Sequence, residues 1–396
     1  MPDPPRLPAG VQLTILMGPL TFSPVPAELA RALVEATVTS ATGQRSGFQL
    51  RFSLARGGFV ENELLANGFF EPPTRVILVA TINGAPAVLS DGVIGRVDVA
   101  ASGHVGASTL TISGSDVSQM MDLIDLSGLP LPAMPAIARV YLTLARYVEY
   151  GVIPIAIPSV LDAAPPNPLE RIPHQQGTDF AYLSQLADEA GYVFYVEPQD
   201  IPGVNTAYWG PEIRLGEPLP PLRVGLGPSS NVDQLSISYD GIRKTLYAVW
   251  INEPISHVSF PLPLPDVNPL TPPQGPIDVP PRSFRQLGHA SRTTRSDHDR
   301  NDAAARFDIA TAIVRGLARA AQTANVVSAS GTLDARRYGG ILRARQLVNV
   351  QGASIDFDGQ YFVRSVTTTL KRGALTQSFQ LERNALRPFS DTVPVS

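Results

Sequence analysis

The sequence predicts a β-rich α+β protein with two antiparallel β-barrels, an α/β unit between them, and a helical and proline-rich insertion. Three observations lead to this class. Six short β-prone segments follow one another near the start, three helix patterns occupy the middle, and a hairpin pattern stands near the end. Short strands rich in β-branched residues and separated by Gly or Pro are typical of closed antiparallel sheets.

The first predicted barrel covers residues 1–115. Segment 48–54 alternates apolar Phe and Leu with Gln, Arg and Ser, which is the pattern of a half-buried strand. Segment 62–66 is expected to form one or two helical turns. The six expected strands are 11–17, 33–40, 48–54, 75–82, 93–100 and 108–113.

The predicted α/β unit covers residues 116–222. Helix patterns are expected over 116–124, 135–150 and 179–190, because their apolar residues recur at three and four positions. The third pattern ends at Gly191 and runs directly into the expected strand 192–196. A helix joined so tightly to a strand predicts a compact α/β packing.

The second predicted barrel combines residues 223–250 with 325–385. Segments 232–239 and 245–250 are expected to pair as its opening hairpin. Between them and the closing strands lies an insertion, 251–324, with ten prolines from 254 to 281 and a helix pattern from about residue 302. So many prolines predict an extended surface segment rather than a sheet interior. Residues 386–396 are expected to form a tail.

The closing stretch, 331–383, is the part of the sequence around which the rest is organised. Segments 361–370 and 375–383 flank the turn 371–374 and predict a hairpin with one apolar face, on which Gln377 is the one polar residue. Asp358-Gly359 is predicted to be a separate turn between the β-rich segment 347–350 and segment 361–370. A structural role in this turn and in the hairpin is predicted for Asp358, Gly359, Tyr361, Phe379 and Leu381.

Composition excludes several classes of protein. Charged residues make up 17% of the 396 residues, against a usual level of roughly 25%, which fits either a large binding surface or a simply apolar-rich chain. The net charge of −4 argues against nucleic acid as a partner. No segment approaches the roughly 20 apolar residues of a membrane span, and the chain has no cysteine.

Catalytic and ligand-binding motifs are missing from the sequence, so we expect no enzyme, no cofactor and no metal. The densest polar group, 296–302, contains one His and three Asp, but it fits a helix N-terminus better than a metal site. Segment 356–359 lacks the spacing of a calcium loop. The histidines are scattered without an acid or a nucleophile at motif spacing.

The closing stretch also carries a resemblance to a known family. Segments 331–334, 337–339, 358–367 and 376–379, together with Arg383, resemble the end of the phage late control D family in order and spacing. Segments 175–180, 189–195 and 205–211 resemble the second domain of the same proteins. The chain departs from the family at Thr368, where members usually have a histidine after the Val-Thr pair.

The resemblance implies a function. Late control D proteins are baseplate hubs of contractile phage tails and injection systems, similar to the hub part of the valine-glycine repeat spike proteins of type VI secretion. It implies a homotrimer that joins a sixfold tail tube to a threefold spike. Its partners would be a tail tube protein, a separate spike protein and other baseplate subunits, without nucleic acid and without a membrane anchor.

Two other functions stay open at this point. One is a cell-surface or carbohydrate-binding tail module, which exposed Trp209 and Trp250 would favour, although both lie in strand-like segments. The other is a hub with cell-wall hydrolase activity, which needs a further domain. The proline-rich start, with an acidic residue, predicts no signal peptide, and we expect assembly in the cytoplasm as part of a particle.

Overall fold

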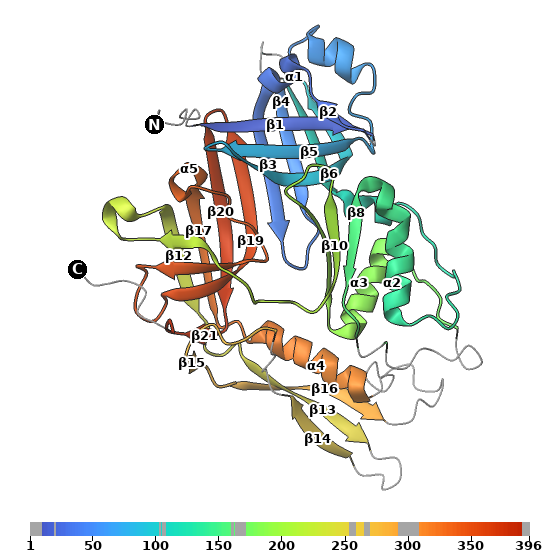
Figure 1. Ribbon diagram of the computed structural model, residues 1–396, viewed down its shortest axis with the longest axis vertical. Helices are drawn as coiled ribbons and strands as arrows, with labels where there is room; N and C mark the ends of the chain where they lie inside the picture. The colour runs from blue at the N-terminus through green and yellow to red at the C-terminus, as the bar shows by residue number, and fades with distance from the viewer. Residues whose placement is uncertain are drawn as a thin grey trace, which may run out of the picture.

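The computed structural model describes residues 10–19, 21–102, 104, 108–159, 162, 172–252, 259–264, 270–291 and 309–389. Strands dominate, as the sequence predicts. A large sheet runs along one side of the molecule, an α/β unit lies beside its upper half, and a small sheet covered by α4 forms the lower end (Figure 1).

The first half of the large sheet contains all six strands predicted for the first barrel. Their order is β2-β1-β5-β6-β7-β4-β3, with every neighbouring pair antiparallel. The short helices α1 (Ala27–Ala32) and η1 (Val60–Leu65) connect them, and η1 overlaps the predicted helical turn. The strands are β1 (Val11–Gly18), β2 (Ser23–Pro24), β3 (Leu33–Ala41), β4 (Gly47–Ser53), β5 (Arg75–Ile82), β6 (Ala85–Ala100) and β7 (Thr109–Asp116).

The second half of the large sheet follows the order β12-β17-β20-β19, and β18 joins β19 to β11. A single helical turn, α5 (Ala335–Tyr338), follows β17, and η5 (Gly227–Ser229) precedes β12. The strands are β11 (Leu219–Arg223), β12 (Val232–Tyr239), β17 (Val327–Asp334), β18 (Leu347–Gln351), β19 (Gly359–Lys371) and β20 (Ala374–Arg383).

The two halves are one continuous sheet. Strand β19 pairs antiparallel with β3, with Thr367 opposite Thr39 and Lys371 opposite Glu35. The sequence predicts two separate barrels, whereas the described strands of both join through this pair. The alternation of buried and exposed residues within β3 and β19 carries no information about which distant strand becomes the neighbour of either one.

The α/β unit packs two helices against one face of a three-stranded sheet, ordered β8-β10-β9. Its core surrounds the fully buried Trp209. The third predicted helix has the predicted bounds, whereas the first is only the short η2 and the second divides into α2 and η3. The elements are η2 (Val117–Asp122), α2 (Ala136–Leu144), η3 (Ala145–Tyr150), β8 (Val152–Ala156), α3 (Asp179–Ala190), β9 (Val193–Pro198) and β10 (Asn205–Gly210).

The lower sheet corrects two predictions. Strand β13 (Thr245–Asn252) does not pair with β12, which pairs with β17 instead. It lies between β14 (Ser259–Leu264) and β16 (Ser283–Ser291), and α4 (Ile309–Thr323) packs on this sheet. The insertion 251–324 therefore contains strands, among them β14 and β16. The prolines of β14 are accommodated because it is an edge strand, where missing N–H groups are tolerated.

Two very short strands, β15 (Ile277–Asp278) and β21 (Ala385–Leu386), pair below the large sheet. The main hydrophobic core draws on both halves of the large sheet, from Ile15 in β1 to Leu381 in β20. Among the described residues, no helix is both long and apolar enough to span a membrane.

Candidate functional site

Asp358 and Gly359, which the sequence predicts to form a turn, lie where a loop leads into β19. Asp358 is buried, and its carboxylate accepts hydrogen bonds from the backbone N–H groups of Gly352, Ala353 and Ser354 at 3.0, 2.8 and 3.2 Å. Gly359 follows with φ of 118°, a conformation that a residue with a side chain rarely adopts. Asp358 thus holds the loop 352–358 closed, and Gly359 starts the strand.

The three apolar members of the predicted set lie in the main core. Tyr361, Phe379 and Leu381 are at most 2% exposed. The Tyr361 hydroxyl donates to the Phe357 carbonyl at 2.7 Å, and burial raises the pKa of this phenol although the neighbouring Arg383 opposes the shift. These side chains anchor the hairpin β19–β20 in the core and leave no group free for chemistry.

Gln377, the polar residue on the apolar face of β20, is fully buried, and both ends of its side-chain amide form hydrogen bonds. Its amide accepts from the Leu342 N–H at 2.8 Å and donates to the Leu342 carbonyl at 3.0 Å. It also donates to the Thr368 hydroxyl at 2.9 Å. Thr368, the position where the resemblance has a departure, therefore supports a buried amide that fixes the loop before β18.

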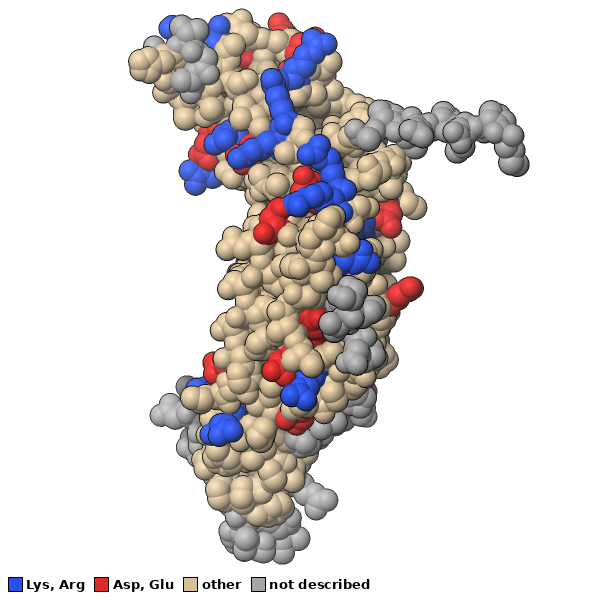
Figure 2. Space-filling view, turned by 90° about the vertical axis from the view of Figure 1, so that its left-hand side faces the viewer, with Lys and Arg blue, Asp and Glu red and all other residues tan. Residues whose placement is uncertain are grey.

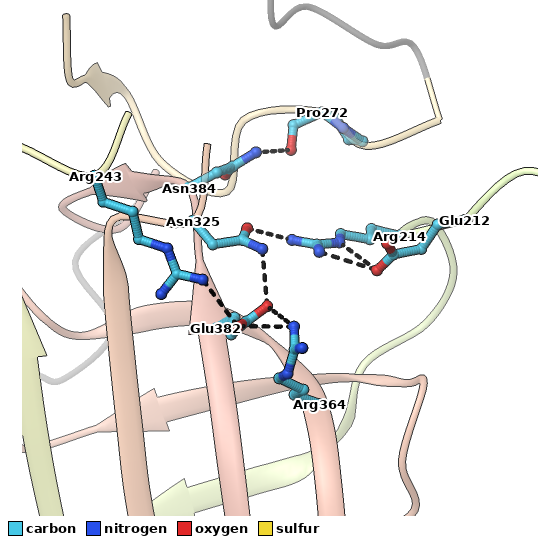
Figure 3. Close-up of polar contacts among 8 residues, drawn as sticks. All are labelled: Glu212, Arg214, Arg243, Pro272, Asn325, Arg364, Glu382 and Asn384. Atoms are coloured by element: carbon cyan, nitrogen blue, oxygen red, sulfur yellow. Dashed lines mark hydrogen bonds and ion pairs between the residues drawn. The ribbon is translucent and has the colours of Figure 1, made fainter. Parts of the chain in front are cut away.

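A polar network at the lower end of the hairpin centres on Glu382, which is only 5% exposed (Figure 3). Arg364 donates to both of its carboxylate oxygens at 3.0 Å, and Asn325 donates to Oε2 at 2.8 Å. Arg243 lies 3.8 Å from Oε1. Alternation in the sequence predicts that Glu382 faces solvent, which is wrong because three groups from distant segments enclose it.

The network continues toward the α/β unit through Arg214. This buried guanidinium donates to Asn325 Oδ1 at 2.6 Å and to Glu212 at 2.9 and 3.0 Å (Figure 3). Its other surface lies on the Phe362 ring, 4.5 Å from the ring centroid. These contacts hold the segment that follows β10 against Asn325 and Phe362, at the lower end of the large sheet.

Arg383, the neighbour of Glu382, is fully buried on the other side of the strand. It donates to the Asp358 carbonyl at 2.7 Å and to the Arg387 carbonyl. Burial lowers the pKa of this guanidinium. The sequence did not predict the burial of Arg214, Asn325 and the adjacent residues Glu382 and Arg383. Polar and charged residues near a strand end are normally exposed to solvent.

A second buried polar cluster, called the Arg75–Asp91 clamp below, joins the first half of the large sheet to the α/β unit. Arg75 in β5 and Asp91 in β6 form two hydrogen bonds of 2.7 Å, with their side chains 3% and 0% exposed. Arg75 also donates to the carbonyls of Tyr150 and Gly203, and Asn205 donates to Asp91 at 3.0 Å. The clamp therefore fixes three separate segments of the chain.

These polar groups are arranged to hold elements together. Each carboxylate of the two clusters already accepts several donors, which leaves no free base beside a nucleophile. Among the residues that the structure describes, no group of three His, Cys, Asp or Glu side chains could hold a metal ion. Segment 296–302, the one candidate from the sequence, lies outside the described residues.

Comparison with known proteins depends on the fold alone. No protein-family model matches the sequence, and a search of curated proteins found no match. A tail protein from Neisseria meningitidis MC58 superposes with a TM-score of 0.59 at 14% identity, over 95% of this chain and 97% of its own. The 43 kDa tail protein of prophage MuSo2 from Shewanella oneidensis gives 0.57 at 13% identity, over 95% and 100%.

The chain has the fold of phage tail proteins. A chain of the Francisella PdpA–VgrG complex shares it, with a TM-score of 0.58 at 9% identity over 99% of this chain and 56% of that one. The resemblance to hub-like tail proteins is therefore confirmed at the level of the fold. Trp209 does not support the carbohydrate-binding alternative, because its side chain is buried and its indole N–H donates to the Leu183 carbonyl.

Proposed function

We propose that this protein is the baseplate hub of a contractile phage tail or injection system, and that it is a homotrimer joining the tail tube to a separate spike protein. The observation that carries the proposal is the extent of the fold match, which covers 95% of this chain and nearly all of two tail proteins. The match covers the whole chain rather than one borrowed domain, so the role is proposed by analogy with the complete fold.

The proposed trimer gives a reason for the two halves of the large sheet. Each half consists mainly of antiparallel strands, with β11 and β18 of the second half as a parallel pair. If each corresponds to one hub barrel, three chains would present six similar surfaces to a sixfold tube and three to a threefold spike. The proposal keeps the boundaries predicted from the sequence, 1–115 for the first barrel and 223–250 with 325–385 for the second.

The proposed role is structural and not enzymatic. The buried carboxylates of Glu382 and Asp91 accept hydrogen bonds that connect separate segments of the chain. Such connections are consistent with a rigid component that bears mechanical force when the tail contracts. A component of this kind is expected to enter the particle during its assembly in the cell. We expect tail tube, spike and other baseplate subunits as its neighbours.

Light scattering of the purified chain, followed by electron microscopy of particles reconstituted with the neighbouring tube and spike proteins, tests the proposal. The expected result is three copies of this chain at the tube–spike junction. Two or six copies, or a position outside that junction, would refute it. A cell-wall zymogram of the isolated chain is expected to show no clearing.

A further inference from the structure

A recess lies at the upper end of the large sheet, where α1 runs directly into β3 beside the tip of the β19–β20 hairpin. Its volume is about 460 Å³. Most of its lining is apolar and is called the apolar floor below; it includes Val34, which is 40% exposed although it belongs to a strand. The apolar residues of the recess are Leu13, Ala30, Leu33, Val34 and Leu370.

The other three residues that line the recess are cations, Arg31, Lys371 and Arg372. Arg372 is fixed there because its guanidinium donates to the Arg31 carbonyl, in the last turn of α1, at 2.7 Å. Lys371 lies 3.3 Å from Glu35. Arg51 contacts the same carboxylate at 2.8 Å, so two cations share it.

The charges at the recess do not balance. Three cations, Arg31, Lys371 and Arg372, line the recess and no acidic residue does, in a chain whose net charge is −4. The neighbouring carboxylate of Glu35 is shared between Lys371 and Arg51. Glu28, the other acid of α1, does not line the recess. Figure 2 shows Lys and Arg side chains, with Asp and Glu side chains among them, on the upper part of one face, in the half that holds α1 and β1.

We propose that this recess binds an acidic polypeptide segment of a partner protein, which places one aliphatic or aromatic side chain on the apolar floor. An exposed apolar floor gives such a side chain a surface to cover. Unbalanced guanidinium groups around it favour carboxylates on both sides of that anchor. The volume lies within the usual range of about 300–1,000 Å³ for binding pockets.

The inference adds the chemistry of one partner to the proposed function, but it does not rest on that function, since binding is measured on the isolated chain. The probe is a fluorescein-labelled peptide, Glu-Asp-Glu-Leu-Phe-Glu-Asp-Glu, followed by fluorescence anisotropy at low and high salt. A peptide with Lys in place of every acid serves as the reference. The acidic peptide is expected to bind, and more weakly at high salt because the charges are exposed.

Two variants separate the recess from general electrostatics. The double variant Arg31→Glu with Arg372→Glu is expected to bind the acidic peptide at least tenfold more weakly. The matched control, Arg336→Glu with Arg337→Glu, makes the same change in net charge on α5, outside the recess, and is expected to bind within twofold of the wild type. Circular dichroism verifies that both variants fold.

The apolar floor is tested by Val34→Asp, which is expected to abolish binding, and by Val34→Leu, which is expected to preserve it. Three results would overturn the proposal. These are no binding of the acidic peptide by the wild type, an equal loss in both double variants, and binding of phosphatidylglycerol vesicles with no binding of the peptide. The last result would identify the recess as a membrane contact.

Discussion

The clamp between Arg75 and Asp91 offers a strong test of how this fold is held together. In the Arg75→Met variant, the Asp91 carboxylate stays fully buried with the amide of Asn205 as its remaining donor. Leaving one charge of a buried ion pair without its partner costs about 3–5 kcal/mol. We expect a loss of this size in the free energy that holds the α/β unit against the large sheet.

The double variant Arg75→Met with Asp91→Leu removes both charges and is expected to be more stable than the single variant. The recovery is incomplete, because the carbonyls of Tyr150 and Gly203 lose their donor and Asn205 loses its acceptor. Each unpaired buried group costs about 1–3 kcal/mol at most, and relaxation reduces the sum. We expect a recovery of about 2 kcal/mol relative to the single variant.

Guanidinium unfolding followed by Trp209 fluorescence measures this effect, with Trp250→Phe as the common background so that one tryptophan remains. Trp209 lies in the core of the α/β unit and reports its separation. Arg51→Met is the control, since its partly exposed pair with Glu35 is expected to contribute about 1 kcal/mol or less. A double variant no more stable than Arg75→Met would refute the reasoning.

Three further predictions concern single positions. Gly359→Val is expected to destabilise by roughly 1–3 kcal/mol from backbone strain at φ of 118°. Its Cβ would also make tight contacts, 3.1 Å from Arg383 Nη2 and from Pro388 Cα, and a melting temperature equal to wild type would contradict the prediction. Gln377→Leu leaves both Leu342 backbone groups unpaired, so hydrogen exchange at that loop should accelerate. Burial raises the pKa of Asp116, so its contribution to stability falls as pH rises from about 4 toward neutrality; Asp116→Asn should remove this decline in urea unfolding at pH 4 and 7.

Sequence patterns predicted local structure far better than they predicted neighbours. Alternation located β4 and β20, and the recurring apolar residues with the stop at Gly191 located α3. These signals are local, because they depend on residues a few positions apart. The pairing of β13 with β14 and β16 was missed, since a Gly-containing turn after β12 resembles a hairpin whether or not the strands pair.

The polar clusters were harder to predict for the same physical reason. Arg214 and Asn325 lie 111 positions apart in sequence, and nothing in either segment indicates the other. Glu382 occupies a position that alternation assigns to solvent, and only the approach of Arg243 and Arg364 makes its burial tolerable. Compensated buried charges are visible only when the fold brings the partners together.

The junction of β3 with β19 has a consequence for how the chain is made. Thr39 and Thr367 face each other across this pair although they lie 328 positions apart in sequence. At a synthesis rate of about 5–20 residues per second, the free edge of β3 waits roughly 15–65 s on the ribosome before its partner strand exists. During that interval the edge is a template for pairing with other nascent chains. Slow translation or crowded polysomes should therefore lower the yield of native protein, whereas a chaperone that covers an extended edge should restore it.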